Sequence, residues 1–313
     1  MSTMPTVLLL PPPGEGGDGG SRGAGVALFF CALIAFASYD AFCKFMLQFY
    51  PAPFVNIMRY VSVSGIALAM LLRHGDMRFW RTPQKKLLLL RGAMLATVAT
   101  CFMTALIWMP LAEATAIYFT APLLMVALSP WLLGEQVRRS RWVAVIVGFG
   151  GMLLIVRPGG SLPLLGTVLM AVAAVCYAIF QLLTRRLAGL VPSPVQYAWT
   201  AAVCLVVTLL PAPFFLPAHT PPVADVLLLL AGGACSAAAQ WLLLAAFERV
   251  EASTLAPLNY FQLLLAVGFS TFWFRKPPDV IAIAGIALIM AAGIYLARAG
   301  AATRQSAARP AAQ

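Results

Sequence analysis

Long apolar stretches alternate with short polar connections along most of this chain, and the alternation predicts its secondary structure. Most stretches approach or exceed the roughly 17 to 20 residues that a helix needs to cross the hydrocarbon core of a bilayer. Apolar and polar residues do not alternate at every second position within them, so they predict helices rather than the strands of a barrel. In order along the chain, the stretches are 25–47, 53–72, 87–109, 114–133, 142–156, 164–183, 195–210, 223–247, 252–274 and 280–297.

The composition indicates that these helices lie in a membrane. Of the 313 residues, 62% are hydrophobic and only 10% are charged, and the mean hydropathy is +0.90. Soluble proteins are about half apolar and about one quarter charged, so a soluble fold of this chain would expose an apolar surface to water. We therefore predict an all-α membrane protein of ten transmembrane helices. The two short stretches, 142–156 and 195–210, must extend into their flanking loops to span the bilayer.

The basic residues predict the orientation. The net charge of +11 does not indicate a nucleic-acid partner, because Lys and Arg neither cluster in one domain nor interleave with exposed aromatics. If the N-terminus is cytoplasmic, the inner loops and tails hold sixteen Lys and Arg, Arg91 among them. The outer loops then hold only Arg157, Arg275 and Lys276. Cytoplasmic loops carry such an excess, so we expect a multi-pass protein of the cytoplasmic (inner) membrane with both termini in the cytoplasm.

Two segments resemble each other at a separation of about 140 residues, which indicates an internal repeat. LAEATAIYFTAPLL, at 111–124, and VEASTLAPLNYFQLL, at 250–264, both place an acidic residue and small residues before a helix with proline and aromatics in its first turns. They predict two halves of five helices, and because five is odd, the second half is inverted in the membrane. The expected divisions are a disordered N-terminal tail at 1–23, repeats at 24–157 and 162–298, and a cytoplasmic tail at 299–313.

The block from residue 111 to 160 carries a family resemblance. Its parts are Ala-Pro-Leu at 121–123, Leu-Gly-Glu at 133–135, a basic stretch with Trp142, and Gly-Gly at 150–151. It resembles the EamA family of the drug/metabolite transporter superfamily, and the likeness extends over nearly the whole chain. The resemblance implies ten helices, a central cavity and transport without ATP hydrolysis. Glu135 has no counterpart in the second half, where Trp-Phe-Arg stands at 273–275.

The resemblance also points toward a group of substrates. Within the family, DAxxK at 40–44, Arg-Tyr at 59–60 and AEATAI at 112–117 look most like bacterial transporters of riboflavin and related metabolites. Riboflavin is flat and carries a polyol, so it would suit aromatic and amide side chains. The same groups suit an aromatic or other amino acid, so riboflavin-like and amino-acid-like substrates both remain open.

Three charged residues inside the apolar stretches are the strongest candidates for a binding site, because charges at membrane depth are costly and usually functional. Asp40 and Lys44 stand four residues apart, so they share one helix face and are expected to pair. Arg59, early in the second stretch, is expected to approach the same face. The trio is interpreted as a site that binds a charged part of the substrate or exchanges protons. The alternatives are a structural ion pair, or Lys44 and Arg59 side chains that extend to the membrane interface.

Polar and aromatic residues in the other stretches form a wider set of candidates, and we expect about a third of them to contact substrate. The remainder are expected to join helices or anchor them at the interface. The substrate-binding candidates are Tyr39, Asn56, Tyr118, Tyr177, Gln181, Gln240 and Asn259, and the wider set adds Trp241, Tyr260 and Gln262.

Catalytic and cofactor sites are not expected. Both histidines, His74 and His219, lie in loops, the six cysteines stand singly, and zinc, phosphate-loop and serine-hydrolase motifs are absent. We therefore predict no metal, no cofactor and no enzyme activity. The predicted function is secondary transport of a small organic metabolite by alternating access, with membrane lipid as surroundings and a homodimer left open. A lipid-handling flippase is the main alternative, and an intramembrane enzyme or a channel fits less well.

Overall fold

A computed structural model describes most of the chain as a bundle of helices. It describes residues 19–74, 82–134, 137–157, 162–187, 190–215, 217, 220–250, 252–255 and 257–308. Within these residues all regular structure is helical, which confirms the all-α class. The first helix begins at Gly19, inside the tail expected at 1–23, and residues 1–18 lie outside the described part.

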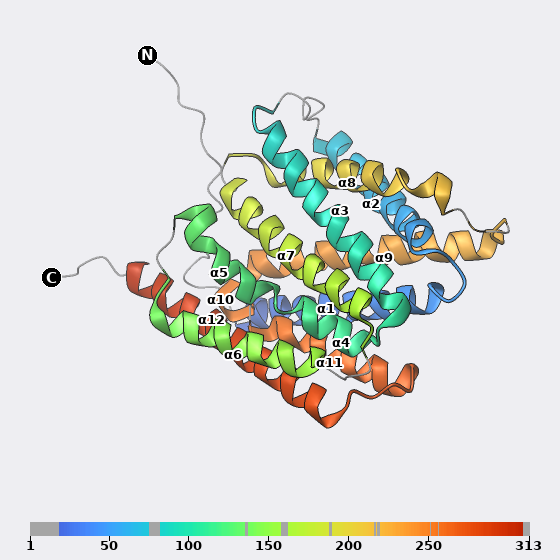
Figure 1. The fold of residues 1–313 in the computed structure, drawn as a ribbon. Helices are drawn as coiled ribbons and strands as arrows, with labels where there is room; N and C mark the ends of the chain where they lie inside the picture. The colour runs from blue at the N-terminus through green and yellow to red at the C-terminus, as the bar shows by residue number, and fades with distance from the viewer. Residues whose placement is uncertain are drawn as a thin grey trace, which may run out of the picture.

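The helices follow the predicted apolar stretches in order, as the colours of Figure 1 show. The elements are α1 Gly19–Met46, α2 Ala52–His74, α3 Lys85–Trp108, α4 Leu111–Tyr118, α5 Ala121–Leu133, α6 Arg139–Val156, α7 Leu164–Leu187, α8 Ser193–Leu209, η2 Ala212–Phe214, α9 Val223–Arg249, α10 Ala252–Leu255, η3 Pro257–Tyr260, α11 Phe261–Gly268, η4 Phe269–Trp273 and α12 Val280–Ala308. As expected from their short apolar stretches, α6 and α8 begin a few residues earlier, at polar positions.

Eight spans in the described residues are long and apolar enough to cross a membrane. One of them combines α4 and α5, and the others are α1, α2, α3, α6, α7, α9 and α12. The α8 helix has 17 residues, and the stretch expected at 252–274 is divided among α10, η3, α11 and η4. The number of transmembrane helices, expected to be ten, therefore stays a prediction for the two segments that are shorter or broken.

The stretch expected at 114–133 is also interrupted. Phe119 and Thr120 form a turn between α4 and α5, and Pro122 occupies the first turn of α5. Proline has no backbone N–H to donate and its φ angle suits a helix start, so it favours a new helix at this point. The α5 helix ends at Leu133, and Gly134 follows with φ of +69°, the left-handed conformation that commonly terminates a helix.

The two halves of the chain pack against each other rather than forming separate domains. From the first half, α6 lies along α12, α3 lies against α7 and α8, and α1 and α2 both contact α9. The α6–α12 contact is close because Gly151 and Gly285 face each other. A Cβ added at either glycine would come within 2.6 Å of the other residue's backbone oxygen. Small residues allow such close approach of helices in membranes.

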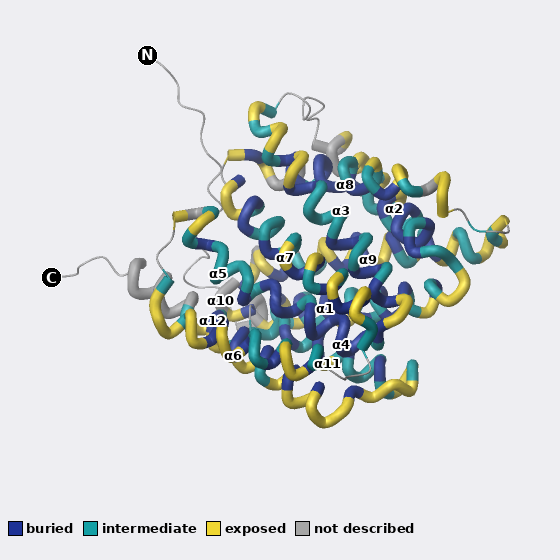
Figure 2. The backbone as a smooth tube through the Cα atoms, in the orientation of Figure 1, coloured by how far each residue is buried: buried dark blue, intermediate teal, exposed yellow. Residues whose placement is uncertain are grey.

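The α4 helix lies at the centre of this arrangement and contacts α7, α11, α3 and α6. Every residue from Leu111 to Ile117 is buried, so α4 has no exposed face. The exterior has the opposite character, as the exposed outer positions in Figure 2 show. Leu153 on α6, Trp131 on α5 and Val206 on α8 are exposed apolar residues, and the lipid of a bilayer would cover them.

Candidate functional site

Asp40 on α1, Arg59 on α2 and Gln262 on α11 are connected by electrostatic and hydrogen-bond interactions. Asp40 is partly buried on α1, and its carboxylate accepts a hydrogen bond of 3.3 Å from the Gln262 amide on α11. Arg59 on α2 interacts electrostatically with Asp40, but no direct ion pair joins these two described residues. The structure therefore brings together two of the three charges in the predicted trio, and it leaves them without a direct bond.

Lys44 does not pair with Asp40, so that part of the prediction is wrong. The Lys44 ammonium donates to the carbonyl oxygens of Leu106, at 2.8 Å, and Met109, at 2.7 Å. It also lies 5.7 Å from the centre of the Phe274 ring. The last carbonyls of a helix have no partner within that helix, and those at the end of α3 attract the long Lys44 side chain more effectively than Asp40 does one turn away.

Two tyrosine rings and one hydroxyl surround the Arg59 guanidinium. The guanidinium carbon lies 4.9 Å from the centre of the Tyr39 ring and 5.6 Å from that of Tyr60, which are cation–π distances. One terminal nitrogen donates to the Ser236 hydroxyl on α9 at 3.2 Å. The Arg59 Nε atom is buried and has no hydrogen-bond partner. Arg59 therefore retains one unused donor.

An aromatic group from α4 and α7 continues the site. The rings of Tyr118 and Tyr177 lie 4.9 Å apart, and Phe102 packs edge-on to Tyr118 at 5.6 Å. Gln181 donates a hydrogen bond of 3.1 Å to the Tyr177 hydroxyl. The charges of Asp40 and Arg59 both act on Tyr118, which connects the aromatic group to the charged pair. We call Tyr39, Asp40, Arg59, Tyr118, Tyr177, Gln181, Ser236 and Gln262 the central cluster.

The remaining candidates are placed differently. Asn56 is buried on α2 and donates to the carbonyl oxygen of Ala99 at 3.2 Å, while its own side-chain oxygen lacks a partner. Asn259 lies partly buried in η3. Gln240 is one turn beyond Ser236 on α9 and is exposed, so the structure leaves it outside the buried cluster.

Sequence reasoning placed Arg91 in a cytoplasmic loop, which the structure corrects. Arg91 is buried in α3, donates to Thr184 at 2.8 Å and to the backbone of Gln196 at 3.1 Å, and also bonds to Thr200. Its guanidinium lies 4.5 Å from the centre of the Phe180 ring. Arg91 thus ties α3 to α7 and α8. The sequence already indicated this position, because the apolar stretch that contains Arg91 begins at Leu87.

Two members of the central cluster were not among the predicted substrate-binding residues. Gln262 belonged only to the wider set, although an amide within an apolar run is a plausible partner for a buried carboxylate. Ser236 stands in the Gly- and Ala-rich part of α9, where a hydroxyl is easily taken for packing. Only the approach of α9 to α2 reveals its role. Among the described residues, no three His, Cys, Asp or Glu side chains gather as a metal site would require.

Two stretches of the chain, residues 23–157 and 164–298, match the EamA-like transporter family. The chain belongs to this family. The match covers both halves of the EamA-like chain and shows its two-repeat layout. It also places the chain in the drug/metabolite transporter superfamily that the motifs indicated.

Relatives of this EamA-like chain carry different transport names. An S-adenosylmethionine uptake transporter of Rickettsia bellii is 25% identical over 87% of this chain and 92% of its own length. The pseudopaline exporter CntI of Pseudomonas aeruginosa is 28% identical over 88% of this chain and 96% of its own length. A riboflavin transporter of Brucella anthropi is 26% identical over 82% of this chain and 92% of its own length.

One solved crystal structure shares the fold of the EamA-like chain. It matches with a TM-score of 0.59 and 21% identity, over 90% of this chain and 99% of the other. The family and the named relatives indicate a multi-pass membrane transporter of small metabolites rather than an enzyme. The identities to importers and an exporter are similar, so likeness alone does not select a substrate or a direction.

Proposed function

We propose that this chain is a secondary transporter that moves a flat, zwitterionic, amino-acid-like metabolite across the cytoplasmic membrane by alternating access. The central cluster receives the substrate. Arg59 binds its carboxylate, Asp40 binds its ammonium group, and the Tyr118–Tyr177 pair packs against its flat part. Both termini lie in the cytoplasm, as the distribution of Lys and Arg indicates.

The observation that carries this proposal is a pair of opposite charges that interact electrostatically while no direct ion pair joins these two described residues. A structural pair would be expected to bond directly, because a buried charge is costly unless it is compensated. Here Asp40 depends on a single amide hydrogen bond, and the Nε atom of Arg59 has no partner. A zwitterion inserted between them would satisfy both groups at once.

The arrangement of the helices supports alternating access. The central cluster takes residues from α1, α2 and α4 of the first half and from α7, α9 and α11 of the second half. A site shared by two repeats is accessible from opposite sides when one repeat moves relative to the other. The broken second-half segment, which contributes Gln262, provides a point where such movement can begin.

A riboflavin-like substrate is the second candidate, and the amides of the cluster favour it. Gln181 and Gln262 both lie beside aromatic or carboxylate groups, and amides suit the hydroxyls and ring carbonyls of riboflavin. S-adenosylmethionine has both a flat ring system and an amino-acid end, so it fits the charged pair as well as the aromatic group. The charged pair is what favours the zwitterion.

Transport by purified protein in proteoliposomes tests the proposal. We would measure uptake of labelled L-phenylalanine, S-adenosylmethionine and riboflavin, together with scrambling of a fluorescent lipid. Arg59→Gln and Asp40→Asn should each reduce uptake of the zwitterion by about tenfold to a hundredfold, because each removes a hydrogen bond to a charged group worth about 1.5–3 kcal/mol. Asp225→Asn is the matched control, since this carboxylate at the start of α9 bonds to Tyr50 instead.

Substrate analogues assign the roles within the pair. L-Phenylalaninamide lacks the carboxylate, so its transport should depend on Asp40 and should hardly change in Arg59→Gln. Uptake of riboflavin alone would replace the first candidate by the second. Lipid scrambling without uptake of any soluble compound would contradict metabolite transport and favour the flippase.

A further inference from the structure

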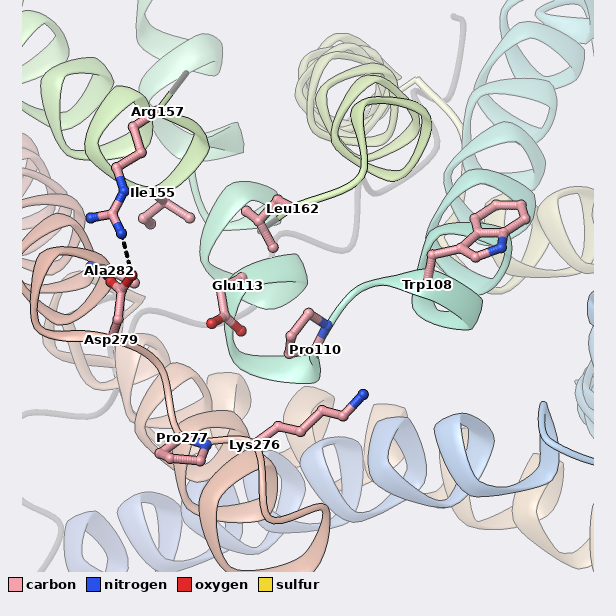
Figure 3. A pocket seen from close by; sticks show the side chains of 10 residues that line it. All are labelled: Trp108, Pro110, Glu113, Ile155, Arg157, Leu162, Lys276, Pro277, Asp279 and Ala282. Carbon is pink, nitrogen blue, oxygen red and sulfur yellow. Dashed lines mark hydrogen bonds and ion pairs between the residues drawn. The ribbon is translucent and has the colours of Figure 1, made fainter. Parts of the chain in front are cut away.

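A pocket of about 380 Å³ lies apart from the central cluster, at the end of the bundle where α3, η4 and α6 terminate. We call this the Lys276 end. The lining combines apolar side chains with two acidic and two basic ones, and Figure 3 shows how they face one another. The lining residues are Trp108, Pro110, Glu113, Ile155, Arg157, Leu162, Lys276, Pro277, Asp279 and Ala282.

Two buried polar atoms at this pocket lack hydrogen-bond partners. Glu113, in the first turn of α4, is only 7% exposed, and its Oε2 atom accepts no hydrogen bond. Arg157 forms an ion pair with Asp279 through one terminal nitrogen, while its Nη1 atom is buried and has no hydrogen-bond partner among the described residues. The pocket lining therefore includes one residue with an unused acceptor and one with an unused donor. Each such buried group costs free energy unless something binds to it.

The Glu113 side chain extends into the pocket rather than into the protein interior. In Figure 3 its carboxylate projects into the space between Pro110 and Asp279. A carboxylate in the first turn of a helix is favoured by the helix dipole, which explains why an acidic residue is tolerated there. The dipole does not explain an oxygen that is buried and unpartnered beside a pocket.

We propose that the pocket at the Lys276 end is a second binding site, which takes the α-amino-acid group of a small zwitterion. Glu113 Oε2 accepts from the ammonium group, and Arg157 Nη1 donates to the carboxylate. Trp108, Ile155 and Leu162 contact the apolar remainder. If the termini are cytoplasmic, this site faces the outside. It serves as the external docking position for the substrate of the central cluster, and in that respect it rests on the proposed function.

The charges of the pocket support a zwitterion over a simple anion or cation. Glu113 and Asp279 offset Arg157 and Lys276, so an ion of either sign would leave a net charge at the site. Lys276 is exposed and extends from its loop toward the Trp108 side, where it can contribute to holding the carboxylate. The volume is within the usual range for small-molecule sites, about 300–1,000 Å³.

Protection of an introduced cysteine against a thiol reagent tests this site without measuring transport. Leu162→Cys places a thiol on the pocket lining, and a membrane-impermeant maleimide is applied to spheroplasts that express the protein. Labelling of native cysteines is subtracted by using the chain without this substitution. The experiment is done in the Arg59→Gln background, so that binding at the central cluster does not contribute.

L-Phenylalanine is the probe. At twice its dissociation constant it should slow the labelling of the introduced cysteine by about threefold, which is the factor 1 + [L]/Kd. Phenethylamine and 3-phenylpropionate, which each lack one charge, should protect less at the same concentration. Glu113→Gln should raise the L-phenylalanine concentration that gives the same protection by about tenfold or more, because the hydrogen bond to a charged acceptor is lost.

Asp225→Asn is the control, because it changes a carboxylate to an amide at the same end of the bundle but outside the pocket lining. It should leave protection unchanged. No protection by any of the three compounds would mean that the pocket holds only water, and equal protection in Glu113→Gln would mean that the probe binds without Glu113; either result would overturn the proposal. Labelling only after the membrane is permeabilised would overturn the external placement. Failure of the central-cluster transport tests would leave the protection result intact.

Discussion

The two broken segments of the chain, one in each half, have related sequences but different structures. Both contain Ala-Pro-Leu, at 121–123 and at 256–258; α5 begins at Ala121, just before its proline, and η3 begins at Pro257. In the first segment the acidic residue precedes this proline by nine positions, from Glu113 to Pro122, and in the second by six, from Glu251 to Pro257. The three additional residues allow eight residues of helix in α4, against four in α10.

This difference separates the roles of the two segments. The first segment supplies a buried helix with an acidic group at one end and Tyr118 at the other. The second segment has shorter pieces and supplies Gln262, the amide that bonds to Asp40. It also ends in a π-helix, Phe269–Trp273, a form that often marks functional segments. We infer that the first segment is the rigid member of the pair and the second the adaptable one.

The largest expected effect concerns the anchoring of the second segment. The Tyr260 ring lies directly against Gly293 of α12, where an added Cβ would overlap the hydroxyl. Gly293→Ala should therefore displace Tyr260 and destabilise the protein by about 1–3 kcal/mol, the usual cost of overpacking. Thermal unfolding in detergent measures this.

Gly268→Ala is the matched control in the same segment, because no atom lies within 4 Å of the added Cβ. It should leave the unfolding temperature close to that of the wild type. An unchanged unfolding temperature in Gly293→Ala would show that the second segment adapts even at Tyr260.

The next effect concerns transport. Gln262→Leu removes the hydrogen-bond donor from the Asp40 carboxylate while keeping the size of the side chain. The initial rate of zwitterion uptake should fall by about tenfold, because a hydrogen bond to a charged group is worth about 1.5–3 kcal/mol. Asn259→Leu, in the same segment, has no hydrogen bond to the cluster and should have a smaller effect. A larger loss of uptake in Asn259→Leu than in Gln262→Leu would show that Asn259 in η3, rather than Gln262, is the functional amide of this segment.

The smallest effect concerns the first segment. The Thr115 hydroxyl is buried in α4 and has no hydrogen-bond partner. Thr115→Val keeps the shape and removes this group, so stability should be unchanged or higher by less than about 1 kcal/mol. Thermal unfolding again gives the result. A clear loss of stability would indicate that water or a ligand normally binds this hydroxyl, and that α4 is less tightly packed than the structure indicates.

The sequence predicted most of the helices because lipid requires long apolar segments, and these are visible as composition. It did not predict the division of 114–133, since α4 and α5 are both apolar and only Pro122 marks the break. The position of Lys44 was missed because a helical spacing of four identifies a shared face, but not a stronger partner on another helix. Glu113 was named only as part of a motif. Its unpartnered oxygen follows from the meeting of α4, α6 and the loop before α12, which no local pattern records.

The length of α4 has a consequence for how the two sites communicate. Glu113 and Tyr118 stand five residues apart on this one helix, which corresponds to about 7.5 Å or roughly one and a half turns. The helix is enclosed on all sides, so a shift at one end is transmitted to the other as a rigid displacement. If a bound zwitterion moves α4, the affinities of the two sites are thermodynamically linked, and each changes the other by the same factor. A substrate arriving from outside would then alter the central cluster before reaching it.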